Sequence, residues 1–157
     1  LHFTDPLFFN KFNVLQERYA IPAHQIIFEI TERDLLDRNN DIFIAKMREL
    51  REEGFSLAVD DYGTGHASIS YLHNFPFNYL KIDKIFIQAI GTKAITESLN
   101  DAIISMAKRL NLIIIAEGVE TEEQVNYLSE NEVRYLQGWY FSKAISIEKL
   151  TKLIKGE

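Results

Sequence analysis

Carboxylate, ammonium and amide side chains follow five short apolar runs of this chain, each at the point where the run ends. Continuous Val, Ile and Leu runs are typical of strands buried on both faces of a parallel sheet, and the polar residues after them lie along one edge. In parallel α/β folds this edge carries the chemistry. The side chains that share this placement are Glu29, Glu32, Asp60, Asp61, Lys81, Asp83, Glu117, Glu120 and Gln137.

Glu29, Asp60 and Asp61 are expected to converge if their strands are neighbours about 4.8 Å apart. Three carboxylates at one edge repel each other and need protons or cations. Oxygen ligands without Cys or a His pair favour hard ions such as Mg²⁺, Mn²⁺ or Ca²⁺. The adjacent Asp60 and Asp61 could serve two ions, the arrangement in which cations activate a water to break a phosphoester. The alternative is that each carboxylate only caps a helix or accepts a hydrogen bond in a turn.

Lys81 lies within an apolar strand, two residues before Asp83, so we expect both side chains on one face. An unpaired buried ammonium is costly, and Lys81 must therefore find an anion. Two interpretations stay open. Lys81 holds an attacking water or offsets transition-state charge, or it forms a buried ion pair with Asp83 or Glu117.

Two glutamates and an amide follow the last two apolar runs. Glu117 is a candidate general base or partner of the activated water, and Glu120 is a candidate substrate contact. Both could instead complement a helix dipole, above all Glu120 beside the helix-capping Thr121. Gln137 carries an amide that suits the edge of a nucleobase, whereas Trp139 is expected in the core rather than as a stacking platform.

The elements that would position these residues alternate along the chain. Helical spacing and capping signals predict helices over 4–19, 41–53, 92–110 and 121–131, and a last helix capped by Ser146. We expect 60–65 to form a loop, followed by one or two helical turns through residue 72. The predicted strands cover 25–30, 55–59, 78–82, 112–116 and 132–136.

Composition limits the classes of function. The chain has 157 residues, 46% of them hydrophobic, and is expected to form a single domain over 1–157. A net charge of −6 without a Lys/Arg cluster argues against DNA or RNA as partners. No apolar run approaches the roughly 20 residues that cross a bilayer, so no membrane contact is expected of this segment. The chain does not open on a signal peptide, and a cytoplasmic location is expected.

The predicted fold class is α/β, with about five parallel strands and flanking helices. Right-handed crossovers would curl these strands into an arc, but a closed (β/α)₈ barrel needs eight strands and about 250 residues. Five strands leave two open edges with unpaired backbone groups. Either the sheet is an open doubly wound one, or further strands are missing; residues 1–3, which resemble the tail of a loop leaving an earlier strand, favour the C-terminal part of a TIM-type barrel. The edge at 25–30 is then expected to be covered by a partner, a swapped segment or N-terminal residues that are missing.

Five motifs of the chain resemble, in order and spacing, those of the EAL-domain cyclic di-GMP phosphodiesterases. The motifs are EITE, DDYGTGHASISYL, LKID, AEGVET and QGWYFSK. This resemblance extends over essentially the whole chain. It implies a modified (β/α)₈ barrel with one antiparallel strand, and Mg²⁺- or Mn²⁺-dependent hydrolysis of cyclic di-GMP to linear pGpG in bacterial signalling.

The resemblance also implies roles for individual residues. Glu29, Asp60 and Asp61 fall on metal-ligand positions of the family. Lys81 and Glu117 fall on positions that handle the catalytic water. Two metal sites are expected in the complete domain.

Four further positions match by the same resemblance. Asp83 and Gln137 match active-site positions, the first taken as catalytic and the second as substrate-binding. Glu120 matches a ligand contact. Glu32 matches a residue that steadies the loop after Asp61, a loop linked in the family to dimerisation and regulation, so a homodimer through this loop and its neighbouring helices is expected.

The chain departs from the family pattern in two ways. The Glu-Ala-Leu motif is absent, with its metal-binding Glu and a nearby substrate-binding Arg, and so is an Asn ligand on the following strand. We therefore expect an active parent but impaired hydrolysis by these 157 residues alone. Tyr62, His66 and Ala67 replace the usual Phe, Tyr and Ser, and Ala144 stands where Pro is common.

Two other functions stay open. A receptor or protein-interaction domain of the same fold would bind cyclic di-GMP without hydrolysing it, although it would have no need of the residues that handle water. Another metal-dependent barrel enzyme would require the five motifs to coincide by chance.

Overall fold

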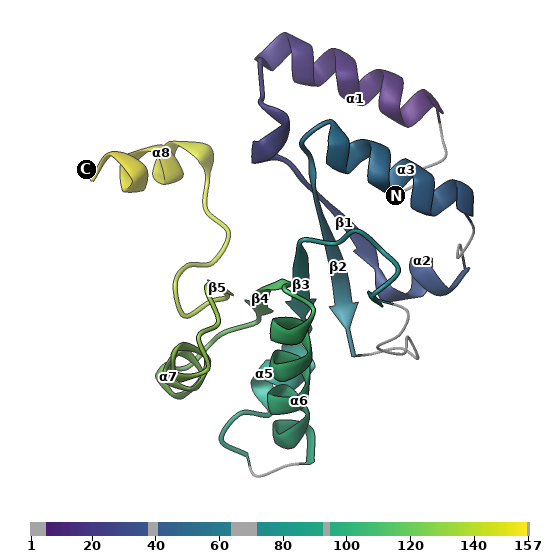
Figure 1. Cartoon of the computed structure of the whole chain (residues 1–157). Helices are drawn as coiled ribbons and strands as arrows, with labels where there is room; N and C mark the ends of the chain where they lie inside the picture. The colour runs from purple at the N-terminus through teal and green to yellow at the C-terminus, as the bar shows by residue number, and fades with distance from the viewer. Residues whose placement is uncertain (1–5, 38–40, 64–71, 93–94, 157) are drawn as a thin grey trace.

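Five consecutive strands form one parallel sheet in the order β1-β2-β3-β4-β5 in the computed structural model, which describes residues 6–37, 41–63, 72–92 and 95–156 (Figure 1). The strands are β1 (Ile27–Thr31), β2 (Ser56–Tyr62), β3 (Tyr79–Ile82), β4 (Ile113–Glu117) and β5 (Tyr135–Gln137). The predicted α/β class with five parallel strands is confirmed. β1 and β5 are the two edges of this sheet.

Helices connect the strands as expected for parallel neighbours, which need crossover connections. They are α1 (Pro6–Tyr19), α2 (Glu32–Asp37), α3 (Asp41–Glu52), α5 (Lys84–Gln88), α6 (Ile95–Arg109), α7 (Glu122–Glu130) and α8 (Ile147–Lys155), with a 3₁₀ turn η1 (Ala23–Gln25). The sequence did not predict α2 and α5, because five or six residues are too few to show a helical period. The turns predicted before residue 72 fall mostly outside the described residues.

The two faces of the sheet differ in chemistry. Alternate residues of β1 to β4 are buried and form the hydrophobic core, among them Ile30, Leu57, Val59, Leu80 and Ile82. The strand register places the intervening residues together on the opposite face. That second face carries Glu29, Asp60, Lys81, Glu117 and Gln137.

Aromatic packing fixes α1 against the first two strands. The Phe12 ring lies 5.1 Å from the Phe28 ring and 5.7 Å from the Phe55 ring, measured between centroids. The Phe28 and Phe55 rings are 5.2 Å apart. Edge-to-face and tilted pairs at these distances stabilise the core beyond the area that they bury. They hold β1, and with it Glu29, in place beside β2.

The end of β2 differs from the prediction. The strand was expected to end at residue 59, but it continues through Tyr62 and includes Asp60 and Asp61. Its pairing with β3 is irregular between Val59 and Tyr62, and Asp61 has a φ of +54°. A regular strand would direct two adjacent side chains to opposite faces. This irregularity lets both aspartates lie at the same edge.

The apolar face of α8 is exposed. The helix has the predicted Ser146 cap, whose hydroxyl accepts a hydrogen bond from the Lys149 N–H. Ile147, Leu153 and Ile154 are nevertheless exposed. Figure 1 shows α8 lying apart from the helices that flank the sheet.

Among the described residues, no helix combines the length and apolarity that a bilayer crossing requires.

Candidate active site

Lys81 brings three carboxylates together at the carboxyl edge of the sheet. Its Nζ lies 2.9 Å from Glu29 Oε2, 2.9 Å from Asp60 Oδ1 and 2.8 Å from Glu117 Oε1. These partners come from β1, β2 and β4, so a side chain of β3 links four of the five strands. The Lys81 side chain is 7% exposed. Of the two ion pairs left open by the sequence, the structure contains the one with Glu117.

A small residue lets Lys81 reach Glu29 across the intervening strand. β2 lies between β1 and β3, and Ala58 is the β2 residue paired with Glu29. Ala58 is fully buried, and its methyl group leaves room above the strand for the two longer side chains. A large residue at this position would separate the ammonium of Lys81 from the carboxylate of Glu29.

The three carboxylates keep Lys81 charged. Burial lowers the pKa of an ammonium, but the hydrogen bonds that Lys81 donates to Glu117, Asp60 and Glu29 outweigh burial and raise its pKa above the usual range. Lys81 is therefore an ammonium at neutral pH. Its single positive charge offsets part of the repulsion among the carboxylates but leaves the site negative.

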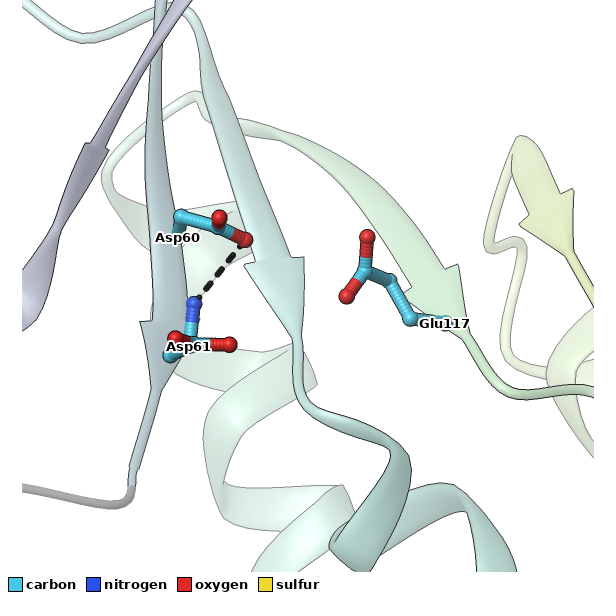
Figure 2. Close-up of side chains that lie close together, drawn as sticks. All are labelled: Asp60, Asp61 and Glu117. Carbon is cyan, nitrogen blue, oxygen red and sulfur yellow. Dashed lines mark hydrogen bonds between the residues drawn. The ribbon is translucent and has the colours of Figure 1, made fainter. Parts of the chain in front are cut away.

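Asp60, Asp61 and Glu117 form the group that could hold a metal ion. One oxygen from each of the three side chains lies within 4.8 Å of the other two. Figure 2 shows the Glu117 carboxylate facing the Asp60–Asp61 pair, while the Asp61 N–H donates a hydrogen bond to Asp60 Oδ1. The sequence had grouped Glu29 with the two aspartates and given Glu117 a different role. Glu117 follows an apolar run of the sequence as Asp60 does, and that shared placement was the available signal.

The electrostatics of Asp61 suit a cation. Burial raises the pKa of its carboxyl, and the negative charges of Asp60 and Asp83 and a hydrogen bond with Asp83 raise it further. Lys81 acts in the opposite direction without cancelling these effects. Oxygen donors with an excess of negative charge fit a hard divalent cation such as Mg²⁺ or Mn²⁺. The residues present therefore match the expected cofactor.

Asp83 lies at the start of α5 rather than beside Lys81. Its Oδ1 accepts a hydrogen bond of 2.8 Å from the Ile85 N–H, which makes it the N-cap of this helix. The cap fixes the carboxylate between the helix and Asp61. Asp83 thus adjoins the acidic group without being a partner of Lys81.

Glu32 holds the turn that follows Asp61. Its side chain is buried, and its Oε2 accepts a hydrogen bond of 2.9 Å from the Gly63 N–H. Gly63 has a φ of +96°, and a Cβ there would lie 2.6 Å from the Phe86 ring. This turn is therefore held by Glu32, the first residue of α2, and is closely packed against Phe86 of α5. His66 and Ala67 lie outside the described residues.

The segments after β4 and β5 are joined through Val119. Its N–H donates to the Gln137 carbonyl and its own carbonyl accepts from the Tyr140 N–H, both at 3.0 Å.

The predicted capping box is confirmed: the Thr121 hydroxyl accepts from the Gln124 N–H, and the Gln124 side chain accepts from the Thr121 N–H. Glu120 also donates its backbone N–H to the Gln124 side chain.

A cavity of about 790 Å³ lies beside these segments. Asp61, Asp83 and Glu117 line it together with Glu120 and Gln137. Its size is in the range of ligand-binding clefts. The structure thus places five of the nine predicted site residues around one cavity, whereas Lys81 ties three carboxylates together at the end of the sheet.

Trp139 contradicts the expectation that it is a core residue. It is 65% exposed and also lines the cavity. The reason is its position: it follows β5 at the edge of the sheet, beyond the strand residues that the core covers.

The EAL domain family model matches residues 1–144 of the chain. The chain belongs to the EAL domain family. Among curated EAL relatives, it is 44% identical over 138 residues to the probable cyclic di-GMP phosphodiesterase PdeN of Escherichia coli, a match that covers 87% of this chain and 26% of PdeN. It is 38% identical over 139 residues to the cyclic di-GMP phosphodiesterase NbdA of Pseudomonas aeruginosa, covering 88% of this chain and 18% of NbdA.

Solved EAL structures have the same fold. The PaMucR phosphodiesterase in complex with cyclic di-GMP gives a TM-score of 0.85 at 30% identity, covering 94% of this chain and 60% of that one. The manganese and cyclic di-GMP complex of Klebsiella pneumoniae BlrP1 gives a TM-score of 0.76 at 27% identity, covering 88% and 35%. The EAL chain described here thus spans about a quarter of PdeN and less than two thirds of the PaMucR structure.

Proposed function

We propose that this EAL chain belongs to an enzyme that hydrolyses a phosphodiester bond of cyclic di-GMP and releases linear pGpG. The observation that carries the proposal is the convergence of Asp60, Asp61 and Glu117 to within 4.8 Å of one another, beside Lys81. This donor set suits cation-dependent phosphoester hydrolysis. The names of the relatives PdeN and NbdA, and the ligand of the PaMucR complex, supply the substrate.

Asp60, Asp61 and Glu117 would hold the divalent cation, with Glu29 proposed as a further ligand. Bound there, Mg²⁺ or Mn²⁺ supplies a more acidic water and neutralises phosphate charge. Glu29 lies outside the group of three but shares Lys81 with Asp60 and Glu117. A small movement of the Lys81 ammonium would free the carboxylate oxygens of Glu29 to bind the same cation.

The chain's own residues would position and deprotonate the attacking water. Lys81 fixes the Glu117 carboxylate through their contact of 2.8 Å, facing the aspartates. From this position Glu117 accepts a proton from the water as it attacks phosphorus, and the bond from phosphorus to the ribose 3′ oxygen breaks, with that oxygen taking a proton from solvent. The Lys81 ammonium opposes the negative charge that develops on the phosphoryl oxygens. Asp83, held as the N-cap of α5, lies beside Asp61 and adds to the negative charge that attracts the cation.

Glu120 and Gln137 are proposed to contact the substrate. Both line the cavity that Asp61 and Glu117 also line. The Gln137 amide carries both a donor and an acceptor, which suits the edge of a guanine, and the Glu120 carboxylate accepts hydrogen bonds from guanine N–H groups.

An assay on two forms of the protein tests the function. Cyclic di-GMP is incubated with the 157-residue chain, and with the same chain joined to the first strands of an EAL domain, in Mg²⁺, Mn²⁺ or chelator. We expect cation-dependent release of pGpG from the joined form and a rate at least about 100-fold lower from the chain alone, because the PaMucR structure contains further chain beyond the matched part.

Each outcome of this assay separates two functions. Comparable turnover by both forms would support the enzyme and overturn the expected impairment. If calorimetry detects binding of cyclic di-GMP but the joined form releases no pGpG, the domain is a receptor rather than an enzyme. If the joined form neither binds nor hydrolyses cyclic di-GMP, this dinucleotide is not the substrate.

Association, location and partners stay predictions. We propose a homodimer through the loop after Asp61 and the neighbouring helices, in a cytoplasmic protein that binds neither DNA nor RNA. Most of that loop, residues 64–71, lies outside the described residues. The open edges β1 and β5 favour association in general. Sedimentation velocity over a range of concentrations tests it, and a monomer throughout would contradict it.

A further inference from the structure

Trp139 is the only tryptophan of the chain and lies exposed in the wall of the acidic cavity. Single exposed apolar residues are common and by themselves indicate nothing. Trp139 differs because its surroundings are those of a site: Gln137 and Glu117 line the same cavity. Aromatic rings in the walls of ligand clefts supply large contact areas at low entropic cost.

Lys143 provides a second, independent observation. Its Nζ lies 4.9 Å from the centroid of the Trp139 ring, a cation–π contact, and Lys143 also lines the cavity. The opposite end of the site is crowded with carboxylates, which repel an anionic ligand. A cation placed on the aromatic wall is therefore where a phosphate group of such a ligand finds compensation.

The backbone holds this pair in position. The Val119 N–H donates to the Gln137 carbonyl and the Tyr140 N–H donates to the Val119 carbonyl, so both neighbours of the Gly138–Trp139 step are anchored to the segment after Glu117. The Phe141 and Ser142 N–H groups then both donate to the Gly138 carbonyl. This turn returns the chain and brings Lys143 back over the ring.

We propose that Trp139 and Lys143 form a purine-nucleotide subsite, in which the indole stacks on one guanine of the cyclic dinucleotide and the ammonium pairs with a phosphate oxygen. The inference rests on the proposed function and adds the residue that recognises the guanine base. The flexible stem of Lys143 lets its ammonium leave the ring face for the phosphate. Gln137, two residues before Trp139, lies where it can read the edge of the stacked base.

The sole tryptophan makes the subsite directly observable. Cyclic di-GMP is titrated into the 157-residue chain with Mg²⁺ present, and both tryptophan emission and calorimetric heat are recorded. Stacking of guanine on the indole is expected to quench the emission along the same saturation curve as the heat. The Trp139→Ala variant should bind between about 5-fold and 150-fold more weakly, the range given by loss of one stacked base.

Three further variants separate stacking from folding. Trp139→Phe keeps an aromatic face and should recover most of the lost affinity. Lys143→Gln should weaken binding and reduce its dependence on salt, because one phosphate contact is lost. Tyr140→Ala is the matched control, since Tyr140 is the next aromatic along the chain, is 45% exposed and does not line the cavity, so its affinity should equal that of the wild type. Circular dichroism confirms that each variant is folded.

The result decides between two failures. Calorimetric binding by the wild type with unchanged emission, or equal affinity in folded Trp139→Ala, overturns the subsite and leaves the proposed function standing. Absence of calorimetric binding to the wild-type chain, with cyclic di-GMP at millimolar concentration, overturns the subsite. If the form joined to the first strands of an EAL domain also fails to bind, the proposed substrate is overturned with it.

Discussion

Lys81 Nζ lies 2.8 Å from Glu117 Oε1, and these two residues stand on the neighbouring strands β3 and β4. The register pairs Lys81 with Ile115, so Glu117 is the next β4 residue on the same face, one step closer to the carboxyl edge. The Lys81 ammonium therefore lies toward the carboxyl edge of the sheet, next to the carboxylates of Glu29 on β1 and Asp60 on β2. This relationship organises the whole acidic site.

Replacing Lys81 by methionine tests whether the ammonium holds the carboxylates together. Lys81→Met keeps the length of the side chain but leaves Glu29, Asp60 and Glu117 to repel one another. We expect the free energy of unfolding to fall by about 1–3 kcal/mol, less than for a fully buried pair because these carboxylates are partly exposed. Urea unfolding measures this change. Mg²⁺ should raise the melting temperature of the variant more than that of the wild type.

The control for this variant is Lys108→Met. Lys108 makes an ion pair of 2.7 Å with Glu132, but both side chains are exposed. Screening by water makes such pairs weak, and the melting temperature should not change. Equal losses in the two variants would contradict a special role for Lys81.

Removing one carboxylate of the acidic group should weaken cation binding. Asp60→Asn, Asp61→Asn and Glu117→Gln each replace an ionised oxygen by a neutral amide of the same shape. Loss of residues that merely support a ligand already lowers metal affinity by about 10- to 100-fold, so loss of a ligand should lower Mn²⁺ affinity at least tenfold. Calorimetry with Mn²⁺ measures it.

Two further variants complete that experiment. Glu132→Gln removes an exposed carboxylate outside the acidic group and should leave Mn²⁺ affinity unchanged. Glu29→Gln decides whether Glu29 is a ligand, as its proposed role requires, or only a partner of Lys81. Wild-type Mn²⁺ affinity in all three variants of the acidic group would show that the cation binds elsewhere.

Adding a methyl group at Gly138 should disrupt the junction between the segments after β4 and β5. A Cβ at this position would overlap the backbone carbonyl and nitrogen of Val119, and backbone cannot give way as a flexible side chain can. We expect Gly138→Ala to lower the free energy of unfolding by about 1–3 kcal/mol and to shift the emission of Trp139. Thermal unfolding and fluorescence check the two effects.

Gly156→Ala serves as the control for that steric effect. Gly156 has nothing within 4 Å of an added Cβ, although its φ is +73°. Only the backbone strain of about 1 kcal/mol applies there, and the emission of Trp139 should not move. A Gly138→Ala variant as stable as this control would refute the close packing against Val119.

Removing the Glu32 carboxylate should loosen the turn beside Asp61. Glu32→Ala leaves the Gly63 N–H without the acceptor that now lies 2.9 Å away. The loss of this bond should cost about 1–3 kcal/mol and lower Mn²⁺ affinity, because Asp61 precedes the turn by two residues. Hydrogen exchange at the Gly63 amide should become faster. Unchanged exchange at Gly63, with a folded variant, would contradict the role of Glu32.

Local pattern was sufficient for much of the fold. Apolar runs indicated all five strands, although the fifth was expected over 132–136 and lies at Tyr135–Gln137. The capping signals at Thr121 and Ser146 identified the starts of two helices. The pattern failed where an element was too short to show a period, as in α2 and α5. It also failed at Asp61, where an irregularity in the pairing of β2 and β3 extends the strand beyond its apolar residues.

The residue types of the site could be predicted, but their partners could not. Carboxylates at strand ends indicate a cation, since repulsion among them requires positive charge. Glu117 was nevertheless given a different role from Asp60 and Asp61, and Trp139 was placed in the core. The order of residues does not show which strand ends lie close enough together to bind one cation. Nor does it show which aromatic side chain remains exposed.

The sequence by itself determined that parallel strands would carry acidic groups to one edge, because strand periodicity and apolar burial are properties of neighbouring residues. The tertiary structure decided that Lys81 pairs with Glu29, Asp60 and Glu117, and that Trp139 faces the cavity. Those relationships depend on register and on the irregular end of β2, which are set by packing between residues far apart in the chain.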